Sequence, residues 1–164
     1  MTRRIEDRPE LIVFDFDGVL TDNRVLVIEN GLEAVFCNRA DGLAFDMLRA
    51  ANMPVMILST EKNPVVAVRA AKLRAPLLQG IGDKRQALAD HCRDAGIDLA
   101  QVVFVGNDVN DIAVMQAVGF PIAVADAHAA VKKIAWTVLS TKGGDGVARE
   151  LVEQVLGLEY GIGG

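Results

Sequence analysis

LIVFDFDGVLTD, residues 11–22, is the stretch of sequence around which the rest of the chain is organised. Four apolar residues lead into two aspartates two positions apart, a pattern typical of a strand that is buried on both faces. Side chains alternate along a strand, so Asp15 and Asp17 should face one small volume if the extended backbone continues past Phe14. Two carboxylates held that close need a shared proton or a cation, and Mg²⁺ is a cation that takes oxygen ligands. The stretch therefore predicts a metal-assisted carboxylate site.

Two other interpretations of these aspartates are a surface turn and a calcium-binding EF-hand loop. The EF-hand loop needs glycine at its sixth position and glutamate at its twelfth. Gly18 is instead the fourth residue of a loop counted from Asp15, so the spacing excludes the EF-hand. The surface turn can be judged only from the rest of the chain.

The length and composition limit the class of protein. A chain of 164 residues can build one domain with a full core but not two ordinary ones, so residues 1–164 are predicted to form a single domain. Apolar residues make up 51% of the chain and aromatic residues 5%, which favours an aliphatic core of the kind found in parallel sheets. The net charge of −5 argues against a nucleic-acid partner, because nucleic-acid phosphates require a basic patch.

The cysteines and the first residues of the sequence indicate a cytoplasmic location. Cys37 and Cys92 form neither a metal-type cluster nor a disulfide framework, which favours a reducing compartment. The opening sequence MTRRIEDRPE is charged and lacks the apolar segment of a signal peptide. No apolar run approaches the ~20 residues of a membrane span, so no membrane partner is expected.

A β-hairpin is predicted directly after the aspartates, at about residues 24–38. Asn30-Gly31 separates the β-rich runs Val25–Ile28 and Glu33–Cys37, and this dipeptide is a strong signal for a type I′ hairpin turn. Because the hairpin follows the aspartates so closely, it can stand over the site that they form.

The remaining chain alternates between short apolar runs and helical patterns. Helices are predicted at about 41–52, 64–73, 83–93, 109–117, 127–134 and 147–156, and further strands at about 55–58, 77–78, 102–105, 122–124 and 137–139. Asp41 and Asp83 suit helix N-caps, and Pro64 suits a first helical turn. Alternation of this kind produces βαβ units, so we expect an α/β fold with a doubly wound, Rossmann-like parallel sheet.

In such a sheet the carboxyl ends of all the strands lie at one edge, where ligands bind. The polar groups that end three of the predicted strands are Asp15 with Asp17, Ser59 with Thr60, and Asn107 with Asp108. Their expected convergence from distant parts of the chain favours the carboxylate site over the surface turn.

These residue types suit phosphoryl transfer, in which catalysis is mostly positioning and charge stabilisation. Asp15 would attack phosphorus and carry a covalent aspartyl-phosphate. Asp17 would protonate the leaving oxygen and then deprotonate the attacking water, and its backbone carbonyl could reach the metal. Ser59 would donate a hydrogen bond to a phosphoryl oxygen, and Lys84 would supply positive charge to the phosphate and the nucleophile.

The metal site would be completed from the later part of the chain. Asn107 and Asp108 would join Asp15 and Asp17 around Mg²⁺, and Asp111 would orient the site from behind these ligands. Between the two candidates that follow the strand at about 102–105, we expect Asn107 rather than Asp108 to be the direct ligand.

These motifs resemble, in order, the four motifs of the haloacid dehalogenase superfamily of phosphatases. They are Asp-x-Asp-Gly-Val after the first strand, Ser59 after the second, Lys84 at a helix start, and Gly-Asn-Asp-x-x-Asp at 106–111. The resemblance implies an aspartyl-phosphate mechanism with Mg²⁺. One departure is Asn107, because the fourth motif of the family usually begins Gly-Asp.

The spacing of the motifs leaves no room for the cap domain of larger family members. The 41 residues from Gly18 to Leu58 are occupied by the hairpin, one helix and a strand, and the 21 residues from Arg85 to Val105 by one helix and a strand. The enzyme is therefore predicted to be capless, with an open site unless a neighbouring subunit covers it.

Further segments resemble the sugar-acid phosphatases, which act on 3-deoxy-D-manno-octulosonate 8-phosphate or 2-keto-3-deoxynononate 9-phosphate. The segments are GVLTD, NRADG, LQG before Lys84, VADAH at 124–128 and GGDGVARE at 143–150. The octulosonate enzymes usually read Thr-Gly-Arg after strand two, whereas this chain reads Ser59-Thr60-Glu61-Lys62, which looks like the nononate enzymes. The resemblance also implies a homotetramer in which a neighbour's hairpin and tail close the site.

Arg69 and Lys72 share a helix face and could hold a substrate carboxylate, including one across a subunit boundary. The plainer interpretation of this pair is a solvated helix face. Asp41, Thr60, Glu61 and Arg149 are further candidates for substrate binding. For three of these four the sequence also allows a structural role: a helix cap for Asp41, a residue favoured by the helix dipole for Glu61, and a helix-surface residue for Arg149.

The sequence therefore predicts a Mg²⁺-dependent phosphomonoesterase acting on a phosphorylated 2-keto-3-deoxy sugar acid. The alternatives are a phosphatase for another small sugar phosphate and a catalytically silent oligomerisation or regulatory module. The second alternative is suggested by the resemblance to the phosphatase-like tail of acylneuraminate cytidylyltransferases.

Overall fold

The computed structural model describes residues 3–159, which form a six-stranded sheet and a separate two-stranded hairpin. All neighbouring strands of the large sheet run parallel. Their order is β5-β4-β1-β6-β7-β8, with the bounds β1 Leu11–Phe14, β4 Val55–Leu58, β5 Leu77–Leu78, β6 Val102–Gly106, β7 Phe120–Ala123 and β8 Thr137–Val138. The predicted doubly wound parallel sheet is confirmed.

Strand β1 lies in the middle of the sheet, where helices cover both faces. Its four residues are all buried, and Ile12 is aligned with Val55 on β4 and with Val103 on β6. From β1 the chain builds the sheet first toward β4 and β5, and then crosses back to place β6 on the opposite side of β1. The carboxyl ends of β1 and β6 thus border the switch point, where ligands bind in open α/β sheets.

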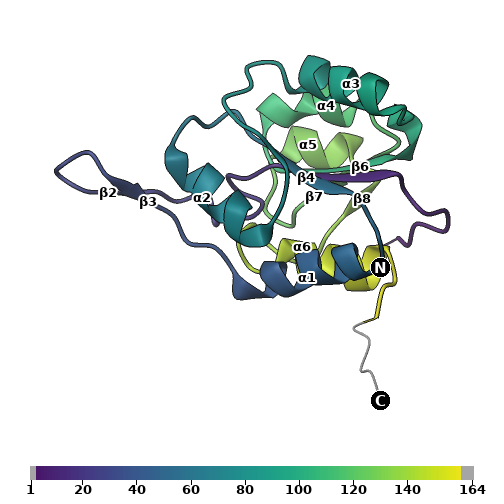
Figure 1. The fold of residues 1–164 in the computed structure, drawn as a ribbon, viewed down its shortest axis with the longest axis horizontal. Helices are drawn as coiled ribbons and strands as arrows, with labels where there is room; N and C mark the ends of the chain where they lie inside the picture. Colours follow the sequence, from purple (N-terminus) through teal and green to yellow (C-terminus); the bar gives the residue numbers. More distant parts are fainter. Residues whose placement is uncertain (1–2, 160–164) are drawn as a thin grey trace.

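Helices lie on both faces of the sheet, as Figure 1 shows: α3, α4 and α5 lie on one face, and α1 and α6 lie on the other. The helix bounds are α1 Arg39–Ala50, α2 Pro64–Leu73, α3 Lys84–Ala95, α4 Ile112–Met115, α5 Ala129–Ile134 and α6 Val147–Glu150. Short 3₁₀ segments, η1 Leu99–Gln101 and η2 Val109–Asp111, precede β6 and α4, and η3 Leu151–Val155 continues α6 as π-helix. The helices predicted from about Val109 and Val147 are therefore each split into two types of helix.

Helix ends follow the predicted cap chemistry, with one exception. Pro64 opens α2, the Asp83 side chain accepts a hydrogen bond from Gln86 N at 3.0 Å at the start of α3, and α3 ends at Gly96 with φ +69°. The prediction that Asp41 caps α1 is wrong. The cap is Asn38, whose Oδ1 accepts from Ala40 N at 2.9 Å, so Asp41 lies inside the first helical turn.

The hairpin consists of β2, Leu26–Val27, and β3, Glu33–Ala34, and it projects from the body of the protein (Figure 1). The predicted type I′ turn is wrong, because that turn requires positive φ at Asn30 as well as at Gly31. Only Gly31 has positive φ, +84°, and Gly31 N donates to Ile28 O at 2.8 Å while Ile28 N donates to Leu32 O. The loop is therefore the three-residue type that ends in a left-handed glycine.

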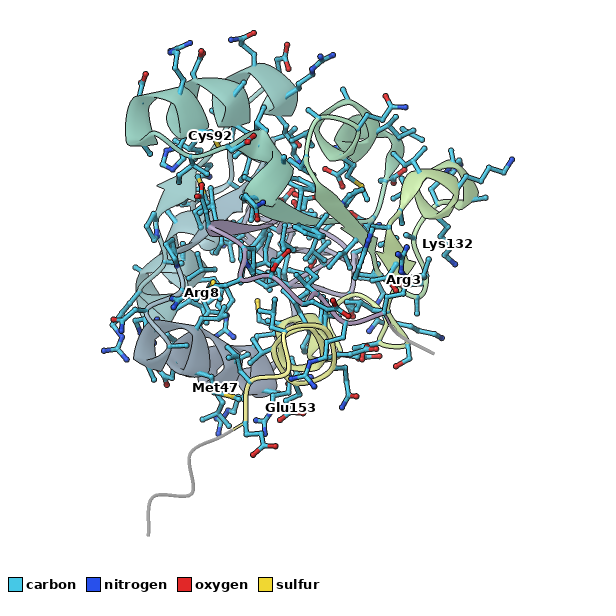
Figure 2. All side chains as sticks on the ribbon, turned by 90° about the vertical axis from the view of Figure 1, so that its right-hand side faces the viewer. Arg3, Arg8, Met47, Cys92, Lys132 and Glu153 are labelled. Carbon is cyan, nitrogen blue, oxygen red and sulfur yellow. The ribbon has the colours of Figure 1, made fainter. Side chains whose placement is uncertain are left out.

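Apolar side chains fill the space between the sheet and its helices. Phe14 on β1 packs against Phe45 on α1 with ring centroids 5.3 Å apart. Cys92 on α3 and Met47 on α1 are both buried, and both are labelled in Figure 2. Arg8, also labelled there, donates from its guanidinium to the carbonyls of residues 51–52 after α1. Across residues 3–159, we find no helix with the length and apolar character needed to span a membrane.

Candidate active site

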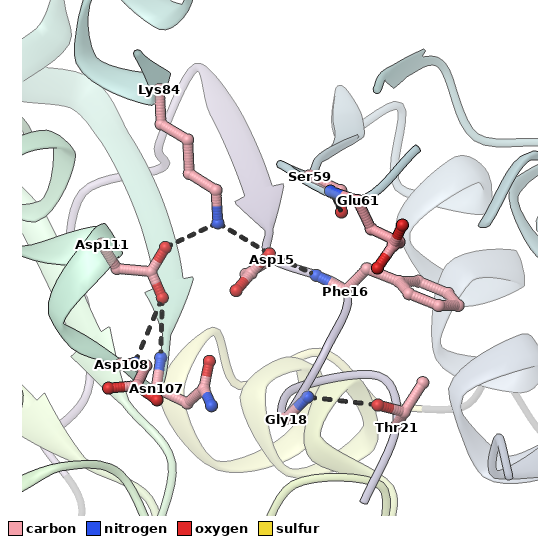
Figure 3. A network of polar contacts seen from close by, with 10 residues as sticks. All are labelled: Asp15, Phe16, Gly18, Thr21, Ser59, Glu61, Lys84, Asn107, Asp108 and Asp111. Atoms are coloured by element: carbon pink, nitrogen blue, oxygen red, sulfur yellow. Dashed lines mark hydrogen bonds and ion pairs between the residues drawn. The ribbon is translucent and has the colours of Figure 1, made fainter. Parts of the chain in front are cut away.

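Three charged side chains meet at the carboxyl edge of the sheet. Lys84 Nζ lies 2.8 Å from Asp15 Oδ1 and 2.7 Å from Asp111 Oδ1, so one ammonium bridges two carboxylates (Figure 3). Asp15 directly follows β1, Lys84 is the first residue of α3, and Asp111 ends η2. All three side chains are buried, which strengthens their mutual attraction because water does not screen it.

Burial and the neighbouring charges together set the pKa values of Asp15 and Lys84. The pKa of Asp15 is raised to about 7, because burial and, next, the Asp111 carboxylate raise it by more than Lys84 lowers it. Burial by itself would lower the pKa of Lys84, but Asp15 and Asp111 outweigh it and the pKa of Lys84 is raised. Two carboxylates against one ammonium leave the site short of positive charge, so it is suited to binding a further cation.

Asn107 presents a free oxygen next to this triad. Its backbone N–H donates to Asp111 Oδ2 at 3.0 Å, which fixes the residue at the end of β6. Its Oδ1 is buried but has no hydrogen-bond partner among the described residues, and leaving such an atom unpaired costs free energy. The side chain extends toward Gly18, where an added Cβ would lie 2.0 Å from Asn107 Nδ2 (Figure 3).

Asp108 is placed differently from Asn107. Its side chain is exposed, and its Oδ1 accepts from Val109 N at 2.7 Å in a capping box with Asp111. Asp108 therefore stabilises the start of η2, whereas Oδ1 of Asn107 accepts no hydrogen bond from the described residues and could bind a metal. Within residues 3–159, no three His, Cys, Asp or Glu side chains are grouped so as to hold a metal ion. A metal here would need a mixed set of donors, such as carboxylate, amide and backbone oxygens.

Asp17 lies at the mouth of the site rather than on an extended strand. Strand β1 ends at Phe14 and a turn follows, so the extended backbone that sequence alternation required does not continue to Asp17. Asp17 instead lines a cleft of about 320 Å³ with Glu61 and Glu33. Burial and, next, the Glu61 carboxylate raise the pKa of Asp17, which favours the protonated form that a proton donor needs.

Ser59 and Thr60 follow β4 but face different surroundings. Ser59 is buried, and its Oγ accepts from Glu61 N at 3.1 Å, which leaves the hydroxyl proton free to donate. Thr60 is exposed and makes no side-chain hydrogen bond with the described residues. Glu61 Oε1 accepts hydrogen bonds from Lys62 N and Asn63 N, so this carboxylate stabilises the turn that follows it at the edge of the cleft.

Arg69 and Lys72 lie in another hollow, a groove of about 640 Å³ between α1 and α2. Their predicted common helix face is confirmed by this groove, which both residues line. Neither residue lines the cleft beside Asp17. Arg69 donates to Asn38 O at 2.7 Å, and its buried Nε has no partner among the described residues.

Two further candidates have structural contacts instead of a place in the cleft. The buried Asp41 side chain accepts from Ala148 N at 3.0 Å and so ties α1 to α6. Arg149 forms an ion pair with Glu153 one helical turn further along, as expected for a residue on a helix surface.

Several residues that line the cleft were not predicted as site residues from the sequence, among them Arg24, Glu33 and Asn63. Asn63 Nδ2 donates to Glu33 Oε2 at 2.9 Å, which links β3 of the hairpin to the loop after β4. Glu33 is exposed and belongs to a strand of two residues, so no periodic signal marks it. Asn63 is recognisable in the sequence only as the cap of α2.

The fold and the site define a class of hydrolase that uses an aspartate after the first strand of a parallel sheet. A family model described as haloacid dehalogenase-like hydrolase matches residues 74–151. The 3-deoxy-D-manno-octulosonate 8-phosphate phosphatase KdsC of Haemophilus influenzae is 35% identical over 148 residues, which cover 90% of this chain and 82% of that protein. The chain therefore belongs to the haloacid dehalogenase-like hydrolase family and, within it, groups with phosphatases.

Solved structures show the same relationship. A protein of Streptomyces avermitilis, provisionally described as a HAD family hydrolase, is 45% identical with a TM-score of 0.91, covering 94% of this chain and 95% of its own. The octulosonate 8-phosphate phosphatase of Moraxella catarrhalis, in complex with magnesium, phosphate and KDO, is 26% identical with a TM-score of 0.85, covering 89% and 84%.

Proposed function

We propose that this protein is a Mg²⁺-dependent phosphomonoesterase that hydrolyses a phosphorylated 2-keto-3-deoxy sugar acid. The observation that carries the proposal is the buried Asp15–Lys84–Asp111 triad beside the Asn107 side-chain oxygen, which has no hydrogen-bond partner in the described part of the chain. The similarity to octulosonate 8-phosphate phosphatases supports the substrate class. The proposal includes a single-domain organisation and a cytoplasmic location, the latter in keeping with the two free cysteines.

In the proposed reaction Asp15 attacks phosphorus and the phosphoester bond to the sugar acid breaks. Asp17 gives its proton to the leaving sugar oxygen and then takes a proton from the water that hydrolyses the aspartyl-phosphate. Lys84 keeps Asp15 oriented and offsets negative charge as the phosphoryl group approaches. The hydroxyl of Ser59, which is free to donate, would hold a phosphoryl oxygen.

The residues present fit a magnesium ion. Asp15 and the Asn107 side-chain oxygen would hold it together with the backbone carbonyl of Asp17, and Asp111 would orient Asn107 through its backbone N–H. Bound there, Mg²⁺ would neutralise charge on the phosphoryl group. Asp108 is the less suitable ligand because its carboxylate is exposed and already bonded to Val109 N.

The cleft beside Asp17 favours one end of the substrate. Its carboxylates, on Glu61 and Glu33, can accept hydrogen bonds from sugar hydroxyls but would repel the carboxylate of the sugar acid. That carboxylate needs cations. Arg24 also lines the cleft but is already paired with Asp22, whereas Arg69 and Lys72 line the separate groove between α1 and α2. We therefore assign these two residues to the substrate of a neighbouring subunit. Two indications of the substrate differ. The segment with Glu61 resembles the nononate 9-phosphate enzymes, whereas the named relatives are octulosonate 8-phosphate phosphatases.

Phosphate release measured with Mg²⁺ on both sugar-acid phosphates tests this proposal. Wild type should hydrolyse at least one of them with a higher kcat/KM than glucose 6-phosphate. Asp15→Asn should lose more than about 10³-fold in kcat because the nucleophile is gone. An equal kcat/KM for glucose 6-phosphate would indicate that the natural substrate is another small sugar phosphate. No turnover of any substrate would support the alternative of a catalytically silent oligomerisation or regulatory module.

The hairpin supports assembly into the homotetramer that the family resemblance suggests. Six large apolar side chains on and around it are exposed, namely Val25, Leu26, Val27, Ile28, Leu32 and Phe36. An exposed apolar surface of this kind marks an interaction site. A two-stranded hairpin is also only marginally stable alone, so packing against other copies would stabilise it.

The mass in solution tests the proposed assembly. Wild type should be a tetramer by light scattering, and Val27→Lys on β2 should shift it toward smaller species. Val138→Lys is the matched control, because Val138 is also exposed but lies on β8 at an outer edge of the sheet. A monomeric wild type would contradict both the assembly and the roles of Arg69 and Lys72 across subunits.

A further inference from the structure

The glycine-rich loop at residues 143–146 lies against the turn that follows Asp17. Gly144 N donates to Val19 O at 3.0 Å. A Cβ on Gly143 would lie 2.1 Å from Gly18 O, and a Cβ on Gly144 would lie 2.4 Å from Asp22 N. Both positions therefore require glycine, because any side chain would push the two loops apart.

Two carboxylates hold this glycine loop in place. Asp126 Oδ1, in the loop after β7, accepts from Gly143 N at 2.9 Å. Glu150 on α6 accepts from Ser140 N at 2.8 Å and Thr141 N at 2.7 Å, which fixes the chain just before the loop. The loop is thus anchored at Gly143, which contacts Gly18, and again just upstream at Ser140 and Thr141.

The same arrangement continues to Asn107. His128 N, two residues after Asp126, donates to Asn107 O at 2.8 Å. The Asn107 side chain in turn packs against Gly18, where even a Cβ would not fit. A closed circuit of contacts therefore runs from Gly18 through Asn107, His128 and Asp126 to Gly143, and back to Gly18.

We propose that Asp126 is a positioning residue, which acts through Gly143 to hold the Asp17–Gly18 peptide and Asn107 at the separation that a magnesium ion requires. The inference rests on the proposed metal site, whose amide and carbonyl donors border this circuit. It gives a function to the VADAH and GGDGVARE segments, which the proposed chemistry leaves without one. Asp126 need not contact the metal or the substrate.

The physical reason is the narrow tolerance of magnesium for ligand geometry. Mg²⁺ demands near-ideal octahedral geometry, with oxygens at about 2.0–2.1 Å. Without the Asp126 carboxylate, the buried Gly143 N–H loses its acceptor and the loop that supports Gly18 is free to shift. Residues that support metal ligands in this way typically change metal affinity by about 10- to 100-fold when replaced.

Calorimetric titration of the metal-free protein with Mg²⁺ alone tests the inference. Asp126→Ala should weaken Mg²⁺ binding by about tenfold or more. Asp126→Asn should stay within about threefold of wild type, because its Oδ1 can still accept from Gly143 N. Asp145→Ala is the matched control, since Asp145 is an exposed residue of the same loop whose carboxylate accepts no hydrogen bond from the described residues. In turnover assays, Asp126→Ala should raise the half-saturating Mg²⁺ concentration while kcat at saturating Mg²⁺ changes by less than about threefold.

The outcomes separate the inference from the site on which it rests. If wild type itself binds no Mg²⁺, the proposed metal site fails. If wild type and Asp126→Ala bind Mg²⁺ equally, the positioning role alone is refuted, even if the variant unfolds at a lower temperature. If the alanine variant does not fold, Asp126→Ser takes its place, because serine is too short to reach Gly143 but keeps the position polar.

Discussion

Replacing Asp41 by asparagine should make the stability of the protein less dependent on pH. The Asp41 side chain is 1% exposed, one oxygen accepts from Ala148 N, and the other has no partner among the described residues. Burial raises the pKa of Asp41 to about 6, although the Ala148 N–H and the Arg69 guanidinium oppose it. The folded protein therefore holds a proton at Asp41 at a pH where the unfolded chain has released it.

The size and sign of the effect follow from that difference in pKa. From 3.8 to about 6 is a difference of about 2 pKa units, and at about 1.4 kcal/mol per unit it corresponds to about 3 kcal/mol. Between these values the folded state binds more protons than the unfolded state. The contribution of Asp41 to the free energy of unfolding is therefore fully present below pH 4 and is lost as the pH rises through 6. Asparagine has no proton to lose, so Asp41→Asn should be more stable than wild type by up to about 3 kcal/mol above pH 7.

Urea denaturation at several pH values from 4 to 8 measures this difference. Asp46→Asn, a half-exposed carboxylate on the same helix that pairs with Arg49 and Arg74, should differ from wild type by less than about 1 kcal/mol. A stability difference for Asp41→Asn that is constant across the pH range would refute the reasoning. The KM of the same variant decides the other possibility, because a raised KM would make Asp41 a substrate-binding residue.

Two further substitutions test the triad and the metal ligand. Lys84→Met should destabilise the protein by about 3–5 kcal/mol at pH 8, because Asp15 and Asp111 are left buried without their partner. The loss should shrink at pH 5, because the raised pKa of Asp15 lets this carboxyl be protonated there, and an equal loss at both pH values in urea denaturation would contradict this account. Asn107→Asp should tighten Mg²⁺ binding about tenfold by calorimetry, since it adds a charge to the ligand set, and weaker binding would exclude residue 107 as a ligand.

Local sequence signals were sufficient for most of the fold. The apolar runs at β1, β4 and β6 are buried on both faces, so their composition alone distinguishes them from surface strands. Pro64 and Asp83 have their predicted roles at helix starts because each acts within one helical turn. The convergence of Asp15, Lys84 and Asn107 follows from the parallel topology, which brings the carboxyl ends of the strands to one edge.

What the sequence could not predict depends on contacts between distant segments. Asn38 and Asp41 are both good N-cap residues. Asp41 instead lies buried in the first turn of α1, where it accepts a hydrogen bond from Ala148 N, 107 positions away in the chain. The same holds for the separation of Arg69 from the cleft beside Asp17, which depends on how α1 and α2 pack. The turn type of the hairpin was missed because Asn-Gly also fits a three-residue loop that places only the glycine in the left-handed region.

The central position of β1 has a consequence for how the protein folds. Leu11 is aligned with Val102, 91 positions later in the chain, so the strand that precedes the nucleophile gains one of its two neighbours only when most of the polypeptide is available. Contacts between such distant residues slow folding, because a long loop must close before they contribute stability. On a growing chain the apolar edge of β1 would stay uncovered until β6 emerges, which is a state prone to aggregation. The chemistry of Asp15 is thus available only after β6 has joined the sheet, because a chain that ends before β6 presents the aspartate without Asn107 and Asp111.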